Sequence, residues 1–322
     1  MRDTSSDFSS GAGARSLSGM TRVFVPEGAL MGTPENRRSL LSENTLRRAR
    51  EDGQVLESRA LLCDGEHNLH VSLGSLRGVI PRREGALGID TGATRDVALL
   101  TRVNKPVQFL VEKFCGNTVY LSRRAVQSAC CKEYLRTLRP GDIVPATVTH
   151  LESFGAFCDV GAGISALLPV SYLCVSRIAH PAARIYAGQS IRAAIKGIDG
   201  CGRITLTMKE LLGTWEENAA ALNPGDTVPG IIRTVEPYGI FVELAPNLSG
   251  LAEYVPGVRP GMQASVFVKS VQPEKMKVKL VLVDAVFGHN TPAPLRYFVD
   301  SGSLGHWLYS PPGCEKTVET VF

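Results

Sequence analysis

Two short segments of the chain combine ring side chains with a glycine at one spacing. They are Phe154-Gly155-Ala156-Phe157 and Tyr238-Gly239-Ile240-Phe241. Proteins that bind a single nucleic-acid strand need flat, exposed rings for base stacking, beside cations that follow the phosphates. Residues i and i+3 of a regular strand point to opposite faces, so Gly155 or Gly239 is expected to kink or bulge its strand and bring both rings to one side. On the residues alone, the alternative that one or both rings fill a core stays open.

Other chemical signatures are missing from the sequence. It contains no GxxxxGK[ST] phosphate loop, no GxSxG elbow and no HExxH motif. His67 and His70 near Cys63 are the nearest approach to a metal site, and a structural role is favoured for them. No carboxylate cluster suits two-metal chemistry. We therefore expect no enzyme activity, no metal, no cofactor and no small-molecule substrate.

The ring segments belong to a longer internal repeat. Pro140-Gly141-Asp142 recurs as Pro224-Gly225-Asp226, at the same offset of 84 that separates the ring segments. A fainter copy lies upstream at an offset of 88. These matches define three units at about 51–122, 139–208 and 223–284, the last of which has lost about ten residues.

Each unit predicts short strands. In the second unit, residues 143–150 alternate and are rich in β-branched side chains, and residues 199–202 form a good hairpin turn. Five strands in about 70 residues indicate a small closed barrel of the OB type. Helices are expected at 34–52, 122–138 and 209–222. The predicted fold is all-β, with three tandem five-stranded OB-fold barrels joined by short helices.

The organisation that follows has five parts. They are an N-terminal extension at 1–50, a degenerate OB-type unit with its linker helix at 51–138, an OB-type domain with its linker helix at 139–222, a shortened OB-type domain at 223–284 and an aromatic C-terminal extension at 285–322. Residues 1–20 are Ser/Gly-rich and expected to be disordered, and Met20 is an alternative start. In the last part we expect Trp307 and Tyr309 to dock on a surface, with the third barrel favoured.

Charge and composition set the remaining bounds. The net charge of +4 is too small to establish a nucleic-acid partner. Residues 139–213 hold seven basic and five acidic side chains, whereas residues 214–284 hold six and eight. No apolar run reaches about 18 residues, so no membrane span is expected. The eight scattered cysteines fit reduced thiols, and a cytoplasmic location is expected.

The second unit, from Gly141-Asp142 through the FGAF segment to Asp199 and Arg203-Ile204-Thr205-Leu206, resembles the S-one RNA-binding domain. The third unit is similar to it nearly as closely, and the first only loosely. The whole chain also resembles short clostridial-type members of the small-subunit ribosomal protein S-one family. The resemblance implies an OB barrel that binds single-stranded RNA through two aromatics, a His, an Asp and an Arg.

Carried over residue by residue, the resemblance assigns RNA contacts in two units. They are Phe154, Phe157, Asp199 and Arg203 in the second unit, and Tyr238, Phe241 and Lys277 in the third. The family's His position holds Pro169 in the second unit and Glu253 in the third, and the third unit's Asp position falls near Gln272. In the first unit, Glu66 and Leu69 stand where the rings are expected. That unit is therefore predicted to keep the fold and lose the stacking platform.

The function expected from these features is binding of single-stranded RNA in translation, on or near the small ribosomal subunit, with mRNA as the favoured RNA. Two classes compete with it. One is a ribosome- or decay-complex-associated scaffold with little RNA affinity, favoured by the acidic third unit and the first unit without rings. The other is a ribonuclease that carries these domains as accessories, which the missing carboxylate cluster opposes.

Overall fold

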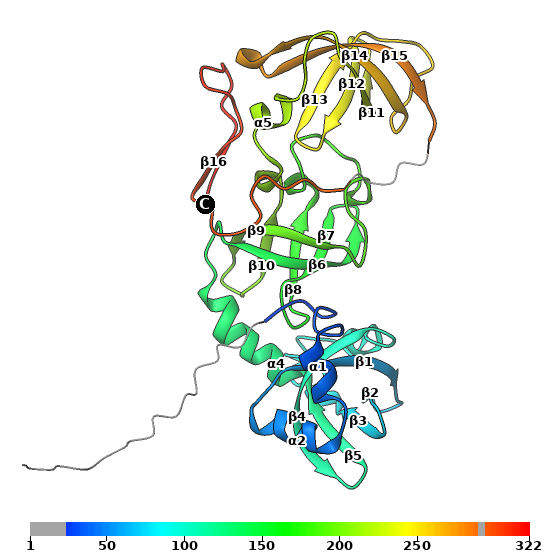
Figure 1. Cartoon of the computed structure of the whole chain (residues 1–322), viewed down its shortest axis with the longest axis vertical. Helices are drawn as coiled ribbons and strands as arrows, with labels where there is room; N and C mark the ends of the chain where they lie inside the picture. Colours follow the sequence, from blue (N-terminus) through cyan, green and yellow to red (C-terminus); the bar gives the residue numbers. More distant parts are fainter. Residues whose placement is uncertain (1–23, 289–293) are drawn as a thin grey trace, which may run out of the picture.

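The computed structural model describes residues 24–288 and 294–322. Its three closed five-stranded barrels follow one another along the long axis of the molecule (Figure 1). The predicted all-β fold with three OB-type barrels is confirmed. Expectations about residues 1–20 and the start at Met20 lie outside the described residues. Within the described part of the chain, no helix has the length and apolar character to cross a membrane.

The three barrels share one topology. In each, the first strand pairs with the second and fourth, and the third strand pairs in parallel with the fifth to close the barrel. The first barrel contains β1 (Leu56–Cys63), β2 (Leu69–Leu73), β3 (Leu76–Ile80), β4 (Pro106–Cys115) and β5 (Thr118–Ser122). The second contains β6 (Ile143–Glu152), β7 (Gly155–Asp159), β8 (Ser165–Pro169), β9 (Ser190–Ile198) and β10 (Ile204–Thr207). The third contains β11 (Thr227–Glu236), β12 (Gly239–Ala245), β13 (Leu248–Ala252), β14 (Gln263–Gln272) and β15 (Lys277–Val286).

Each barrel buries its own apolar core. Strand residues alternate between the core and the outer surface, as their period of two requires. The core of the first barrel centres on Phe109 and Leu121, that of the second on Leu168 and Ile195, and that of the third on Val266 with its neighbours. The repeat seen in the sequence is therefore a repeat of core and surface positions.

Four of the five α-helices in the described part of the chain lie where the sequence predicts them, and the short α3 was not expected. They are α1 (Pro34–Ser39), α2 (Glu43–Glu51), α3 (Val97–Leu100), α4 (Arg123–Ala129) and α5 (Trp215–Ala219). Thr33 caps α1, whose first residue is Pro34, and Ser42 forms a capping box at α2. Helix α4 continues through a π-turn at Cys130–Tyr134 and a 3₁₀ turn at Leu135–Thr137 into the second barrel. The predicted linker helices are thus present.

The segment before α1 packs on the first barrel and joins it to the second. The buried Glu57 carboxylate accepts hydrogen bonds from the backbone N–H groups of Gly28, Leu30 and Met31 at 2.5–2.8 Å. Glu27 is buried between the barrels, where its carboxylate pairs with Arg123 at 2.7 Å. The first barrel therefore depends on residues upstream of its strands.

The C-terminal segment runs back across the second barrel and links it to the third (Figure 1). The Leu304 N–H donates a backbone hydrogen bond to the Gly141 carbonyl at the start of the second barrel, and β16 (His306–Leu308) pairs with β17 (Glu319–Val321). Gly141 has φ +92°, and a Cβ atom there would lie 1.9 Å from the Leu304 carbonyl oxygen, so only glycine fits.

The expected docking of this segment on the third barrel is confirmed. Trp307 and Tyr309 are each 6% exposed and belong to the core cluster of that barrel. Their ring centroids lie 5.5 Å apart. The Tyr309 hydroxyl also donates a hydrogen bond to the backbone carbonyl of Asn247 at 2.6 Å. Residues 294–322 therefore form an ordered segment that docks on the third barrel, and this segment is called the strap below.

Candidate nucleic-acid interface

The two rings of the second barrel form a half-exposed pair on its outer surface. Their centroids lie 6.1 Å apart with an interplanar angle of 88°, an edge-to-face contact. Phe154 is 54% exposed, and Phe157 is partly buried. Neither ring belongs to the core cluster of the barrel, so the rings do not fill its interior.

The hairpin turn brings the two rings together, and β7 itself has no bulge. Phe154 lies in the two-residue turn between β6 and β7, and Phe157 is the third residue of β7. The break in register lies on the partner strand, between Val148 and His150. The expected bulge at Gly155 is therefore wrong, because a residue in a turn does not follow the alternation of a strand.

Gly155 instead permits close packing between β7 and β8. A Cβ atom at this position would lie 2.6 Å from the Leu168 carbonyl oxygen and 2.9 Å from the Pro169 Cα atom. The glycine lets β8 approach the start of β7 closely. It thereby fixes the strand on which Phe157 stands.

Asp199 and Arg203 lie together at the turn between β9 and β10. The Asp199 carboxylate accepts hydrogen bonds from the backbone N–H groups of Cys201 and Arg203, both at 2.9 Å, and from Arg203 Nε at 2.8 Å. These hydrogen bonds, the one from the Arg203 backbone first, hold the pKa of Asp199 below its usual value. The acid thus shapes the turn and holds an exposed guanidinium in place.

The strand register relates this cation to the rings. Thr205, Leu167, Phe157 and His150 form one row across β10, β8, β7 and β6. Arg203 lies just before β10, two residues from Thr205 of this row. His150 is exposed beside Phe157 and was missed by the sequence analysis, although its position in the alternating strand could have indicated it.

The third barrel repeats the ring geometry. The centroids of Tyr238 and Phe241 lie 6.2 Å apart at 87°, and Tyr238 is 69% exposed. Tyr238 again lies in the turn before the strand, here between β11 and β12. A Cβ atom at Gly239 would lie 2.6 Å from the Ala252 carbonyl oxygen, so this glycine also permits a close approach of strands.

The charged groups around this second pair differ. Lys277 is exposed at the start of β15, and the described residues include no ion pair for it. Lys279 lies in the same row as Leu251 and Phe241, a cation that sequence reasoning did not assign. Glu253 is exposed just after β13. The ring-bearing surface of the third barrel therefore has two lysines and an acid, whereas that of the second barrel has an arginine held by Asp199.

The first barrel corrects the sequence alignment. The pair Leu62 and His70 occupies the place of His150 and Phe157, next to the same break in register. Leu69 is fully buried in the core, so its expected position at a ring site is wrong. The segment from Leu62 to His70 is one residue longer than the segment from His150 to Phe157. A slip of one residue moves a side chain to the opposite face.

With this register, His67 and His70 replace the two rings, and Glu66 does not. His70 Nε2 lies 2.9 Å from the Asp64 carboxylate, and this hydrogen bond holds the pKa of Asp64 below its usual value. His67 has φ +63°, and its buried Nδ1 lacks a hydrogen-bond partner in the described part of the chain. The first barrel thus lacks Phe and Tyr at its ring positions but retains two imidazoles.

No metal centre emerges from the described residues. Among residues 24–288 and 294–322, no three or more His, Cys, Asp or Glu side chains gather in a way that could hold a metal ion. His67 and His70 are instead accounted for by their positions in the β1–β2 hairpin.

Comparisons with known proteins match the second barrel to a known domain family. Residues 137–209 match the S1 RNA binding domain family. The small ribosomal subunit protein bS1 of Staphylococcus aureus (strain COL) is 32% identical over 182 residues, which cover 51% of this chain and 46% of that protein. The bS1 protein of Rhizobium meliloti (strain 1021) is 29% identical over 247 residues, covering 69% and 43% respectively. The chain thus spans less than half the length of these relatives.

Among solved structures, a multidomain protein with nucleic acid binding domains from Streptococcus pneumoniae is similar over 73% of this chain and 75% of its own. Its sequence identity is 14% and its TM-score 0.25. The solution structure of GSP13 from Bacillus subtilis covers 27% of this chain, with 17% identity and a TM-score of 0.23.

Proposed function

We propose that this S1-domain chain binds single-stranded RNA on the outer faces of its second and third barrels. The observation that carries the proposal is the exposed ring pair of the second barrel, which is accompanied by the exposed Arg203 guanidinium that Asp199 holds in place. Bases stack on such rings with little sequence preference, and the guanidinium neutralises phosphate. Asp199 acts as a positioning residue because it holds the turn and the guanidinium.

The cellular setting is part of the same proposal. The relatives of matching sequence are named as small ribosomal subunit proteins, which supports a role in translation on or near that subunit, in the cytoplasm, with mRNA as the RNA. We propose a binding role without catalysis, since the ring pair and cations explain the site without a nucleophile or a general base. A scaffold with little RNA affinity remains the competing function.

The test is replacement of the rings in the full chain. Phe154→Ala with Phe157→Ala should weaken binding of a short oligouridylate at least tenfold, since stacking contributes ~1–3 kcal/mol per base. Fluorescence anisotropy at two salt concentrations measures the loss, and circular dichroism checks the fold. Val97→Ala with Leu100→Ala, two exposed apolar side chains of α3 outside both ring-bearing barrels, is the matched control. Unchanged affinity in the folded ring variant would favour the scaffold.

A further inference from the structure

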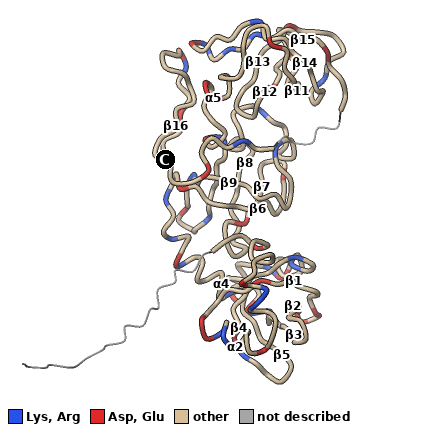
Figure 2. The backbone as a smooth tube through the Cα atoms, viewed as in Figure 1, with Lys and Arg blue, Asp and Glu red and all other residues tan. Residues whose placement is uncertain are grey.

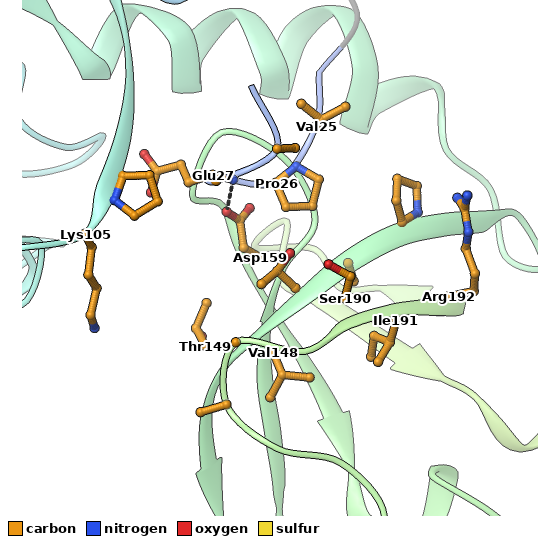
Figure 3. Close-up of a pocket in the computed structure, with 18 of the residues that line it drawn as sticks. Val25, Pro26, Glu27, Lys105, Val148, Thr149, Asp159, Ser190, Ile191 and Arg192 are labelled. Carbon is orange, nitrogen blue, oxygen red and sulfur yellow. Dashed lines mark hydrogen bonds between the residues drawn. The ribbon is translucent and has the colours of Figure 1, made fainter. Parts of the chain in front are cut away.

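A groove lies between the first and second barrels. It has a volume of about 930 Å³, within the ~300–1,000 Å³ range of ligand sites. Its lining comes from residues 25–29 and 102–106 on the side of the first barrel and from β6 and β9 on the side of the second. Figure 3 shows Lys105 and Arg192 at opposite ends of this lining.

The acids on the floor of the groove interact with the protein. Asp159 accepts hydrogen bonds from the backbone N–H groups of Glu27 at 2.7 Å, Gly161 at 2.8 Å and Gly163 at 3.0 Å. The Glu27 carboxylate is held by Arg123 at 2.7 Å and Arg102 at 3.3 Å. Burial raises the pKa of Asp159 to about 7, which further reduces its negative charge near neutral pH.

The ends of the groove carry available positive charge. Lys105 and Arg192 are exposed, and the described residues contain no ion pair for either side chain. Asp300 is the exposed acid of the lining and accepts a hydrogen bond from the Ser301 hydroxyl at 3.0 Å. Since Glu27 and Asp159 are buried, the two exposed cations outnumber the one exposed acid of the described lining, and the surface offered to a ligand is positive.

The groove is continuous with the ring pair. Thr149 lines it, and the Thr149 hydroxyl donates a hydrogen bond to the Phe157 carbonyl oxygen at 3.0 Å. Asp159 follows Phe157 by two residues on the same side of β7, and it pairs with Thr147 of the groove wall. An RNA strand that lies over the Phe157 ring therefore reaches the groove after passing only two residues of β7.

We infer that single-stranded RNA held by Phe154 and Phe157 continues into this groove, where Lys105 and Arg192 contact its phosphates. The inference rests on the proposed function and adds a second segment of RNA to it. It also gives the first barrel a role in RNA binding, through the groove wall and independently of the histidines at its ring positions.

The test compares RNA lengths in the full chain. The probes are oligouridylates of about 5 and about 15 nucleotides, chosen because single barrels of this kind cover roughly 4–16 nucleotides. Lys105→Glu with Arg192→Glu should weaken binding of the longer RNA at least fivefold and leave the shorter within twofold. The slope of log affinity against log salt should fall by about 1.4 for the longer RNA, at ~0.7 per phosphate contact.

The control reverses the same amount of charge elsewhere. Lys132→Glu with Arg136→Glu changes two exposed cations of the linker that do not line the groove. Lys105→Ala with Arg192→Ala repeats the test without new acids, should the reversed variant fail to fold. Equal effects of groove and control variants on the longer RNA would overturn the inference, as would an equal loss for both lengths.

The outcomes also separate this inference from the proposed function. If wild-type protein fails to bind the short RNA, or the ring variant binds it normally, the proposed function fails. If short-RNA binding depends on the rings while added length brings no affinity that depends on Lys105 and Arg192, the groove inference alone fails. Photo-crosslinking of 4-thiouridine RNA should join residues 102–106 to a nucleotide several positions from the one at Phe157, and its absence would contradict the path.

Discussion

In the second barrel the two rings meet at 6.1 Å and 88°, and in the third at 6.2 Å and 87°. The angle and distance are set by the hairpin turn and the close-packed glycine, which both barrels share. The charged residues differ: Arg203 is hydrogen-bonded to Asp199 in one barrel, whereas Lys277 is the first residue of β15 in the other. Ring geometry is thus a property of the repeat, and electrostatics is a property of each loop.

A second pair of equivalent positions leads to the same lesson. Asp159 and Glu243 occupy matched places in β7 and β12, and each is buried where its barrel meets the preceding one. Asp159 is held by backbone N–H groups, whereas Glu243 pairs with Arg184 at 2.6 Å and Arg233 at 2.8 Å. Each junction therefore uses an acid at the same repeat position with different donors.

The largest expected effect comes from removing the acid between the second and third barrels. Glu243→Gln leaves the buried Arg184 and the partly buried Arg233 without their counter-charge, which should lower the free energy of unfolding by ~3–5 kcal/mol. Both tryptophans, Trp215 and Trp307, lie in the core cluster of the third barrel, so their fluorescence during urea unfolding reports on it.

The exposed Glu253→Gln is the matched control and should change stability little.

Burial opposes ionisation of Glu243, but hydrogen bonds from both arginines outweigh it and lower its pKa. Its contribution is therefore present above the unfolded pKa of ~4.3 and is lost as pH falls through the lower folded value. A difference between wild type and Glu243→Gln that grew in acid would contradict this account.

The strap should contribute nearly as much to the third barrel. Trp307→Ala removes a ring that is 6% exposed in the core cluster of that barrel, a change that typically costs ~3–5 kcal/mol in a well-packed site. The variant should also let protease cleave the segment beyond residue 294 rapidly. Val321→Ala, an exposed residue of β17, serves as the control. Unchanged stability and unchanged cleavage would show that the strap does not support the barrel.

The comparison of the two ring pairs yields a smaller effect. Tyr238→Ala with Phe241→Ala should weaken binding of a short oligouridylate about threefold, less than the equivalent change in the second barrel. The reason is that Glu253 repels phosphate near the third pair and no fixed arginine accompanies it. Glu253→Gln should recover part of the affinity at low salt, since screened charges act weakly at high salt. Equal losses of RNA affinity from the two ring variants would show that the charged loop residues do not make the two barrels differ in RNA binding.

Sequence reasoning succeeded where the repeat is strict. The offset of 84 between the second and third units aligned Phe157 with Phe241 correctly, because their hairpin turns have equal length. It failed in the first unit, where one extra turn residue moved Leu69 into the core and placed His70 at the ring site. An inserted turn residue does not change the alternation of apolar and polar side chains within either strand, so that alternation cannot reveal the insertion.

The contacts between barrels were beyond the sequence for a different reason. Arg184 and Glu243 are 59 residues apart, and Glu27 and Arg123 are 96 apart. Each is an ordinary charged residue in its own segment. Only the relative placement of two barrels brings them together, and no local pattern encodes that placement. The strap was anticipated because its rings were too many for a solvated tail, whereas its backbone hydrogen bond with Gly141 was not.

The smallest expected effect distinguishes the two junction acids by titration. Burial, together with the nearby charge of Glu27, raises the pKa of Asp159 to about 7, whereas the pKa of Glu243 is lowered. A raised pKa means that the folded chain holds a proton that the unfolded chain has released between about pH 4 and 7. The contribution of Asp159 to stability therefore falls as pH rises through that window, the opposite sense to Glu243. Carbon-13 NMR of the side-chain carboxyls should give a midpoint near 7 for Asp159, with the exposed Asp199 titrating below its usual value as an internal reference. A midpoint below 4 for Asp159 would mean that its backbone donors outweigh its burial, and the two junctions would then respond to acid in the same sense.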